Sequence, residues 1–194
     1  MKIVCAEQAR VEAELLGGLL ACPSCQGTLG PWGHARERVT RRFSADWRWR
    51  PRRARCRGCR GTHVLLADVC LLRRQDGVEV IGAAIEAHVG GEGHRPVAAR
   101  LGVPAATVRG WLRRFDRRAE QVRAHFTRFA VALDPELGSV LPAGSVVADA
   151  LEAIGVAGRA WVLRFGRCPV WWIASRVSAG GLLSCNTSSL ATGA

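Results

Sequence analysis

Residues 94–112 read HRPVAARLGVPAATVRGWL and have the spacing of a helix-turn-helix. Ala98 is small where two helices would cross, and Gly102 supplies a tight turn between them. The positions where such helices bury side chains against each other are all apolar: Val97, Leu101, Val103, Val108 and Trp111. Few other motifs combine these features, so the stretch predicts a compact helical unit.

In a helix-turn-helix, the second helix enters the DNA major groove with its N-terminal part. Here that helix is expected over 104–115, with five positions facing outward: Ala105, Ala106, Arg109, Gly110 and Arg113. Arg109 is the preferred base reader, because a guanidinium can bond both acceptors of guanine. Further side chains are better placed for phosphates: Arg95, Arg100, Thr107, Arg114, Arg117 and Arg118. The stretch predicts sequence-specific binding of double-stranded DNA, with a helical hairpin that binds no nucleic acid as the alternative.

The flanking segments extend this unit to residues 76–133. Upstream, apolar residues repeat at helical spacing from Val78 to Val89, and Gly90 to Gly93 then end the helix. Downstream, no Pro or Gly interrupts 112–133, so either the second helix runs on or another follows it at once. The apolar stripe of this segment, from Phe115 to Leu133, packs on the C-terminal segment or forms a dimer seam.

Four cysteines organise residues 1–75. Cys22 and Cys25 form one C-x2-C pair, and Cys56 and Cys59 form a second pair thirty residues later. This spacing predicts a zinc ribbon with one structural Zn²⁺ per chain, because four thiolates leave no open position for catalysis. The alternative, a redox pair, requires a βαβ context that is absent from the sequence. The remaining cysteines are expected to be buried free thiols: Cys5, Cys70, Cys168 and Cys185.

The segment between the cysteine pairs contains WRWRPR at 47–52. Its alternation places Trp47 and Trp49 on one face of a ribbon strand. The other face presents Arg48, Arg50 and Arg52, which we expect to contact DNA phosphates. His34 and His63 are interpreted as polar surface or phosphate-facing residues rather than metal ligands. Residues 7–20 predict a short helix with Val11, Leu15 and Leu19 covering one side of the ribbon.

The charge is concentrated in two places. The 194-residue chain carries a net charge of +12, with +9 in residues 31–60 and +7 in residues 94–128. Two separate basic patches favour a polyanionic partner. No apolar run reaches the roughly 18–20 residues that a membrane span needs, and the N-terminus is acidic where a signal peptide is basic. We therefore expect a cytoplasmic protein with neither a membrane partner nor a small-molecule substrate.

Residues 134–194 have no net charge and predict a helical tail. Pro and Gly residues at 135–144 form a linker, and Ser145 can cap the helix that follows it. A further short helix is expected over 169–177. The tail is expected to pack on Phe126 and Phe129, with a Trp-rich partner surface as the alternative. Residues 186–194 are small and polar and are expected to be disordered. The expected fold class is thus mainly α with a small β zinc ribbon.

The motifs also resemble a known family. The pattern CPxC…RxRRxRCxxC followed by HRxxAxRLGVPxxTVRxWLRRF is similar to the N-terminal DNA-binding region of bacterial insertion-sequence transposases. It more closely resembles small bacterial zinc-ribbon and helix-turn-helix proteins of uncharacterised function with PWGHARxR and THVLLP phrases, found here at 31–38 and, with Ala67 in place of the proline, at 62–67. The likeness covers about residues 20–130. It implies DNA binding linked to mobile elements. We expect either a transcriptional regulator or a transposase-associated protein, with a homodimer or a separate transposase subunit as partner, in the bacterial nucleoid.

The chain itself is not expected to be an enzyme. A transposase needs acidic residues on an RNase H-like core that holds two metal ions, and no β-rich segment after residue 130 could carry that core. Two other functions remain open. One is a zinc-dependent protein-protein adaptor whose basic faces meet acidic proteins. The other is an RNA-binding zinc ribbon in which Trp47 and Trp49 stack on bases.

Overall fold

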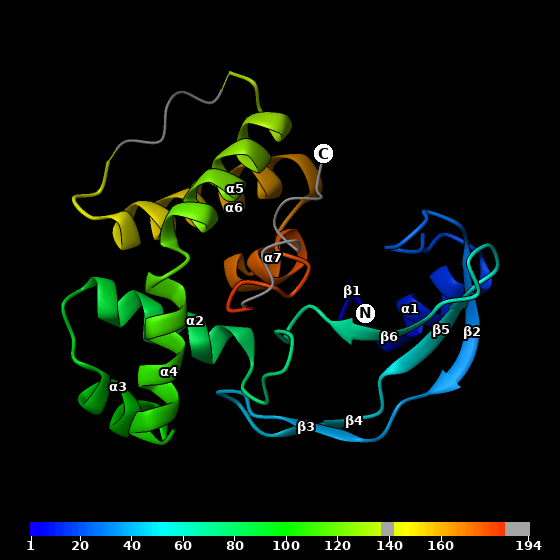
Figure 1. Cartoon of the computed structure of the whole chain (residues 1–194), viewed down its shortest axis with the longest axis horizontal. Helices are drawn as coiled ribbons and strands as arrows, with labels where there is room; N and C mark the ends of the chain where they lie inside the picture. The colour runs from blue at the N-terminus through cyan, green and yellow to red at the C-terminus, as the bar shows by residue number, and fades with distance from the viewer. Residues whose placement is uncertain (137–141, 185–194) are drawn as a thin grey trace.

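The computed structural model describes residues 1–136 and 142–184, which form a β-rich N-terminal half and a helical half (Figure 1). Within these ranges the fold is mixed α/β, with seven helices, a four-stranded sheet and a separate two-stranded sheet. The small β ribbon predicted from the cysteine spacing is therefore part of a larger β region. No helix in the described ranges has the length and apolar character to cross a membrane.

The four-stranded sheet has the order β1-β6-β5-β2. Its strands are β1 (Lys2–Val4), β6 (Thr62–Ala67), β5 (Arg52–Cys56) and β2 (Leu29–His34). β5 pairs antiparallel with both neighbours, whereas β1 pairs parallel with β6 and was not predicted. This pairing joins the start of the chain to a strand about sixty residues later, a non-local contact that a three-residue strand does not announce.

Helix α1 (Gln8–Leu16) covers one side of this sheet, as predicted. Val11 and Leu15 are buried in the same apolar cluster as Leu29 and Ala54 of the sheet. The helix is shorter than the expected 7–20, because Gly17 and Gly18 end it, the latter with a left-handed φ of 68°. Leu19 consequently lies outside the helix and is 76% exposed, so its predicted place on the buried face was wrong.

The strand that contains Trp47 and Trp49 is not part of the four-stranded sheet. β3 (Arg38–Thr40) and β4 (Trp47–Trp49) form the separate two-stranded sheet. Trp47 and Trp49 lie on one face as predicted, with parallel rings 4.6 Å apart. Trp49 is buried, and its indole N–H donates to Thr40 Oγ1 at 3.1 Å. Two ion pairs fix this hairpin to the helical half, Arg41 with Asp76 at 2.9 Å and Arg42 with Glu79 at 2.8 Å.

The helical half begins with α2 (Val78–Val89), α3 (His94–Leu101) and α4 (Ala105–Asp116). Helix α2 ends at Gly90, as the glycine run predicted. Helix α4 ends at Asp116 and α5 (Ala119–Leu133) follows almost at once, which is the second of the two arrangements expected for 112–133. Pairwise contacts among α2, α3 and α4 bring the three helices into one unit.

The C-terminal helices α6 (Val146–Phe165) and α7 (Val170–Val177) pack against this unit. Ser145 caps α6 as predicted, its Oγ accepting from the Ala148 N–H at 3.2 Å. Helix α6 lies along α5, where the rings of Phe129 and Trp161 are 6.1 Å apart (Figure 1). One apolar core, running from Leu71 to Leu183, joins the segments 76–133 and 134–184. The predicted disorder of 186–194 and the predicted thiol Cys185 lie outside the described residues.

Candidate metal centre and nucleic-acid interface

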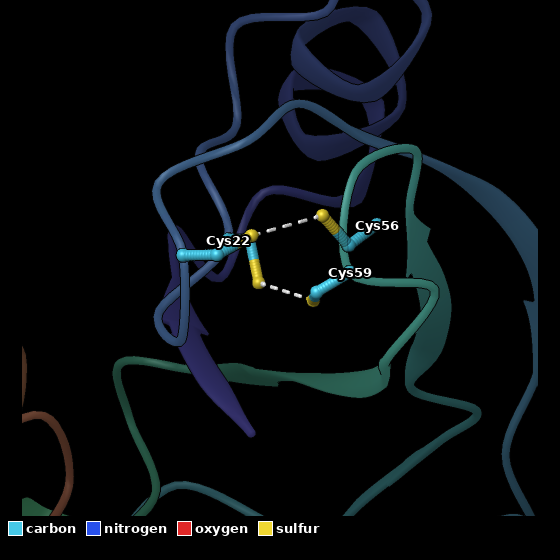
Figure 2. A group of neighbouring side chains, drawn as sticks. Cys22, Cys56 and Cys59 are labelled. Atoms are coloured by element: carbon cyan, nitrogen blue, oxygen red, sulfur yellow. Dashed lines mark hydrogen bonds between the residues drawn. The ribbon is translucent and has the colours of Figure 1, made fainter.

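The four predicted cysteines come together at one end of the sheet. Cys22 and Cys25 lie in the loop before β2, and Cys56 and Cys59 lie where β5 ends. All four Sγ atoms are within 4.8 Å of one another, and in Figure 2 the labelled side chains point toward one another from facing loops. The four cysteines are therefore close enough to hold a metal ion.

The two loops have the same backbone design. In each, the residue after the second cysteine adopts a left-handed conformation, Gln26 with φ 60° and Arg60 with φ 62°, and a glycine follows. The first cysteine of each pair donates its N–H to that glycine carbonyl, with N···O distances of 2.7 Å for Cys22 and 2.9 Å for Cys56. The motif is thus a repeated C-x2-C-x-G, a signal present in the sequence that the cysteine spacing alone did not use.

The sulfur positions fit a tetrahedral ion. Cys22 Sγ lies 3.8 Å from Cys59 Sγ, and Cys25 Sγ lies 3.5 Å from Cys56 Sγ. Four thiolates about 2.3 Å from a central ion have sulfurs about 3.8 Å apart at ideal tetrahedral angles. A side chain at Gly27 would press on the cluster, because its Cβ would lie 3.2 Å from Cys56 Sγ and 3.4 Å from Cys25 Sγ. The glycine therefore keeps room for the cysteine cluster.

The thiols are arranged for partial ionisation. Burial opposes ionisation of Cys22, but backbone N–H groups of Ser24 and Cys25 outweigh it and lower its pKa to about 7. The Gly27 N–H contributes most to lowering the pKa of Cys25 to about 6. At Cys59 the Gly61 N–H also favours the thiolate, yet the neighbouring sulfurs raise the pKa to about 11. Without a cation, ionising all four thiols is costly because the charges repel.

His63 lies against the cysteine cluster and not on the surface. Its side chain is buried, with 8% of the residue exposed, and Nε2 is 3.3 Å from Cys22 Sγ. Its interpretation as a surface or phosphate-facing residue was therefore wrong, because β6 turns it inward beside the Cys59 loop. His34 is exposed on β2, as expected. Of the isolated cysteines, Cys70 is buried, whereas Cys5 and Cys168 are only partly buried.

The basic helix α4 has two distinct faces. Its apolar residues are buried: Val108, Trp111, Leu112 and Phe115. On the other side Ala106, Arg109 and Arg113 are exposed, and no carboxylate in the described ranges pairs with either arginine. Gly102, between α3 and α4, has a left-handed φ of 63°. Ala105, Thr107 and Gly110 are half-buried at the edge of the exposed face.

The arginines predicted around this helix differ in how far they are already engaged. Arg95 is exposed on α3, while Arg100 pairs with Glu92 at 2.7 Å. Arg114 is half-buried and donates to the Gly110 carbonyl at 2.7 Å, and Arg117 donates to the Arg113 carbonyl at 3.2 Å. Arg118 is buried, so its predicted phosphate contact was wrong: it lies between α4 and α5, where the chain turns inward.

The three arginines of the WRWRPR segment do not form one row. Arg48 is exposed, with its Nη1 3.7 Å from Oε1 of Glu37, which is also exposed. Arg50 is exposed beyond the end of β4. Arg52 belongs to the next strand, because Pro51 ends the alternation. Its guanidinium donates to both carboxylate oxygens of Glu12, at 2.7 and 2.6 Å. Arg52 is thus bound to α1, which corrects its predicted place on a phosphate-binding row.

The chain matches no known protein-family model, no curated protein and no solved structure. The resemblance to insertion-sequence transposases and to zinc-ribbon and helix-turn-helix proteins therefore stays a prediction.

Proposed function

We propose that the protein is a sequence-specific double-stranded DNA-binding protein that uses α3 and α4 as a helix-turn-helix. In this proposal α4 enters the major groove, and its exposed face reads base edges. The four-cysteine centre would hold one structural Zn²⁺ that fixes the β-rich half. The protein would then bind chromosomal DNA in the cytoplasm. Its role would be in transcription or in transposition.

The observation that carries the proposal is the exposed face of α4. Arg109 and Arg113 lie one helical turn apart on the exposed face of α4, and the opposite face is buried. No carboxylate of the described residues pairs with either arginine. The neighbouring Ala106 has a short side chain, so the backbone can approach a groove floor closely. An unpaired guanidinium can donate two hydrogen bonds to guanine O6 and N7.

The remaining basic groups support this orientation. Arg95 at the start of α3 is exposed, as a phosphate contact beside the groove requires. Arg48 and Arg50 extend the positive surface onto the β3–β4 hairpin, which ion pairs hold against the start of α2. These side chains would add affinity for phosphate without adding selectivity.

Zinc is the metal that the cysteine centre favours. Four sulfur donors in a tetrahedral arrangement are typical of zinc or of an iron–sulfur site, and two C-x2-C knuckles are typical of structural zinc. Such a site gives folding energy, because the unfolded chain does not preserve it. Metal analysis of the purified protein should give one zinc per chain, and Cys56→Ser should lower both zinc content and stability. A Cys56→Ser protein with full zinc and unchanged stability would overturn the assignment.

Random-site selection with the zinc-loaded protein tests the DNA proposal. We expect an enriched duplex motif, and binding to it should weaken steeply as salt rises, because phosphate contacts release counterions. Equal affinity for the selected site and for scrambled duplex would refute sequence-specific binding. Little duplex affinity at about 0.15 M salt would instead favour the adaptor function.

A further inference from the structure

The outer face of the four-stranded sheet is a second basic surface, distinct from α4. On β5, Ala54 and Cys56 are buried beneath α1, so the alternating Arg53 and Arg55 point to the opposite face. The register places Gly30 of β2 beside Arg55. In Figure 1, β2 and β5 lie at the far end of the view from α3 and α4. A ligand on this face would not occupy the exposed side of α4.

The charge of this surface is of one sign. Strands β2, β5 and β6 contain no Asp or Glu, and the loop that follows β5 adds Arg57 and Arg60, both exposed. Through the parts of the chain that the structure describes, no carboxylate pairs with Arg55, Arg57 or Arg60. A partner of this face must therefore supply the negative charge.

An exposed aromatic ring lies among these basic side chains. Trp32 on β2 is 50% exposed, and the Arg55 guanidinium lies over its ring, 4.6 Å from the centroid. The Arg55 Nε–H also donates to the Arg60 carbonyl at 3.3 Å, which holds the guanidinium in place. Trp47 and Trp49 offer no comparable surface, because they stack on each other and Trp49 is buried. The RNA-binding alternative considered from the sequence placed base stacking on Trp47 and Trp49 instead.

We infer that this face binds single-stranded nucleic acid, with unpaired bases stacking on the Trp32–Arg55 pair and phosphates contacting Arg57 and Arg60. Aromatic rings and guanidinium planes on a sheet are suited to unstacked bases. A duplex offers this surface only phosphates, because its base faces are covered by stacking. The surface therefore favours a single strand over a duplex, and it extends the proposed duplex binding by α4 with a second activity.

Fluorescence anisotropy with labelled single strands tests this surface. The probes are oligothymidylate and oligouridylate of about 15 nucleotides, and a scrambled duplex serves for comparison. Trp32→Leu should weaken single-strand binding by about tenfold, since stacking is lost, whereas Trp32→Phe should keep it within about threefold. Phe43→Leu is the matched control, because Phe43 is an exposed aromatic of the same basic segment but belongs to the loop between β3 and β4, outside the four-stranded sheet. Equal zinc content in all variants shows that the fold is kept.

Each outcome has a defined meaning. Trp32-dependent binding of both strands supports the surface with no preference for sugar, and binding of one strand alone supports it and identifies the nucleic acid. If Trp32→Leu binds the single strands as tightly as the unchanged protein, or weakens scrambled duplex by the same factor, the inference is overturned. Arg109→Ala should leave single-strand binding intact. A protein that binds no duplex but retains Trp32-dependent binding of single strands would refute the proposed function and keep this one.

Discussion

His63 Nε2 lies 3.3 Å from Cys22 Sγ, and His63 is buried beside the cysteine cluster. When Cys22 is a thiolate bound to metal, an Nε2–H can donate a hydrogen bond to its sulfur and spread the negative charge. Partners of this kind orient metal ligands, and their loss costs about 10–100-fold in affinity. We expect His63→Ala to lose zinc to a chelator faster than the unchanged protein, within that range.

His34→Ala is the matched control for this measurement, because His34 is also a histidine of the β-rich half but is exposed. His63→Gln should fall between the two, since its amide N–H can replace the donor in part. Zinc transfer to a chromogenic chelator gives the rates. Identical rates for His63→Ala and His34→Ala would show that the buried ring fills space and does not support the metal.

A second prediction concerns the contact between helices α2 and α7. A Cβ atom at Gly82 would lie 2.1 Å from the Trp171 indole, which is held by a hydrogen bond from Nε1 to Glu86 Oε1 at 2.8 Å. Gly82→Ala must displace the indole, and overpacking of this kind costs about 1–3 kcal/mol of unfolding free energy. Denaturant unfolding measures the change.

Gly155→Ala provides the control on α6. The nearest atom to its added Cβ is the flexible end of Arg159 at 3.6 Å, so the substitution should be neutral or stabilise by up to about 1 kcal/mol through helix propensity. If Gly82→Ala lowers the free energy of unfolding and Gly155→Ala does not, the loss at Gly82 comes from packing and not from helix propensity. Equal effects would show that Trp171 moves aside at little cost.

Local patterns in the sequence predicted the parts of the molecule that local chemistry determines. The repeated cysteine spacing identified all four members of the cluster, because each C-x2-C knuckle forms within a few residues. The apolar repeat and the glycines identified α2, and the Ser145 cap marked the start of α6. The duplex-reading role of α4 stays a prediction, since it concerns a partner and not the fold.

Contacts between distant segments account for what the sequence did not predict. His63 reaches the cysteine cluster because β6 pairs with β5, and no spacing in the sequence encodes that approach. Arg52 is bound by Glu12, forty residues earlier, only because α1 packs on the sheet. The alternation in WRWRPR predicts one strand through Arg52, but Pro51 ends the pattern and Arg52 begins the next strand. Period-two patterns give the face of a side chain but not its partner.

The Glu12–Arg52 pair makes stability depend on pH. The hydrogen bonds from Arg52 hold the pKa of the Glu12 carboxyl below its ordinary value. A carboxyl whose pKa is lowered by folding contributes stability above its unfolded pKa and loses it as pH falls through the folded pKa. Glu12→Gln should therefore be less stable than the unchanged protein near neutral pH, by about 0.5–1 kcal/mol because the pair is partly exposed. This difference should shrink and vanish as pH falls through the lowered folded pKa of Glu12.

Thermal or denaturant unfolding from neutral to acid pH measures the Glu12→Gln difference. Asp46→Asn is the control, because Asp46 is exposed in the turn between β3 and β4 and pairs with no arginine in the described ranges. A Glu12→Gln difference that stays constant with pH would mean that the pair acts by packing alone.

The last prediction separates reading bases from holding phosphates. Arg109 projects from the exposed face of α4, whereas Arg48 and Arg50 project from the β3–β4 hairpin, which has no reason to match the hydrogen-bond pattern of a groove. We expect Arg109→Ala to lose about 1–3 kcal/mol on the selected site and to flatten selectivity at one base pair. The double variant Arg48→Ala, Arg50→Ala should weaken all duplexes alike and lower the salt slope by up to about 0.9 per lost phosphate contact.

Arg52→Ala distinguishes this arrangement from the single arginine row that the sequence predicted. Because the Arg52 guanidinium is already neutralised by Glu12, its removal should leave the salt slope unchanged while lowering stability. Salt titrations of the unchanged protein and of each variant, on the selected site and on scrambled duplex, give the slopes and affinities. If Arg109→Ala lowers both affinities by the same factor, α4 does not read bases, and the helix pair is then a basic phosphate-binding surface without sequence specificity.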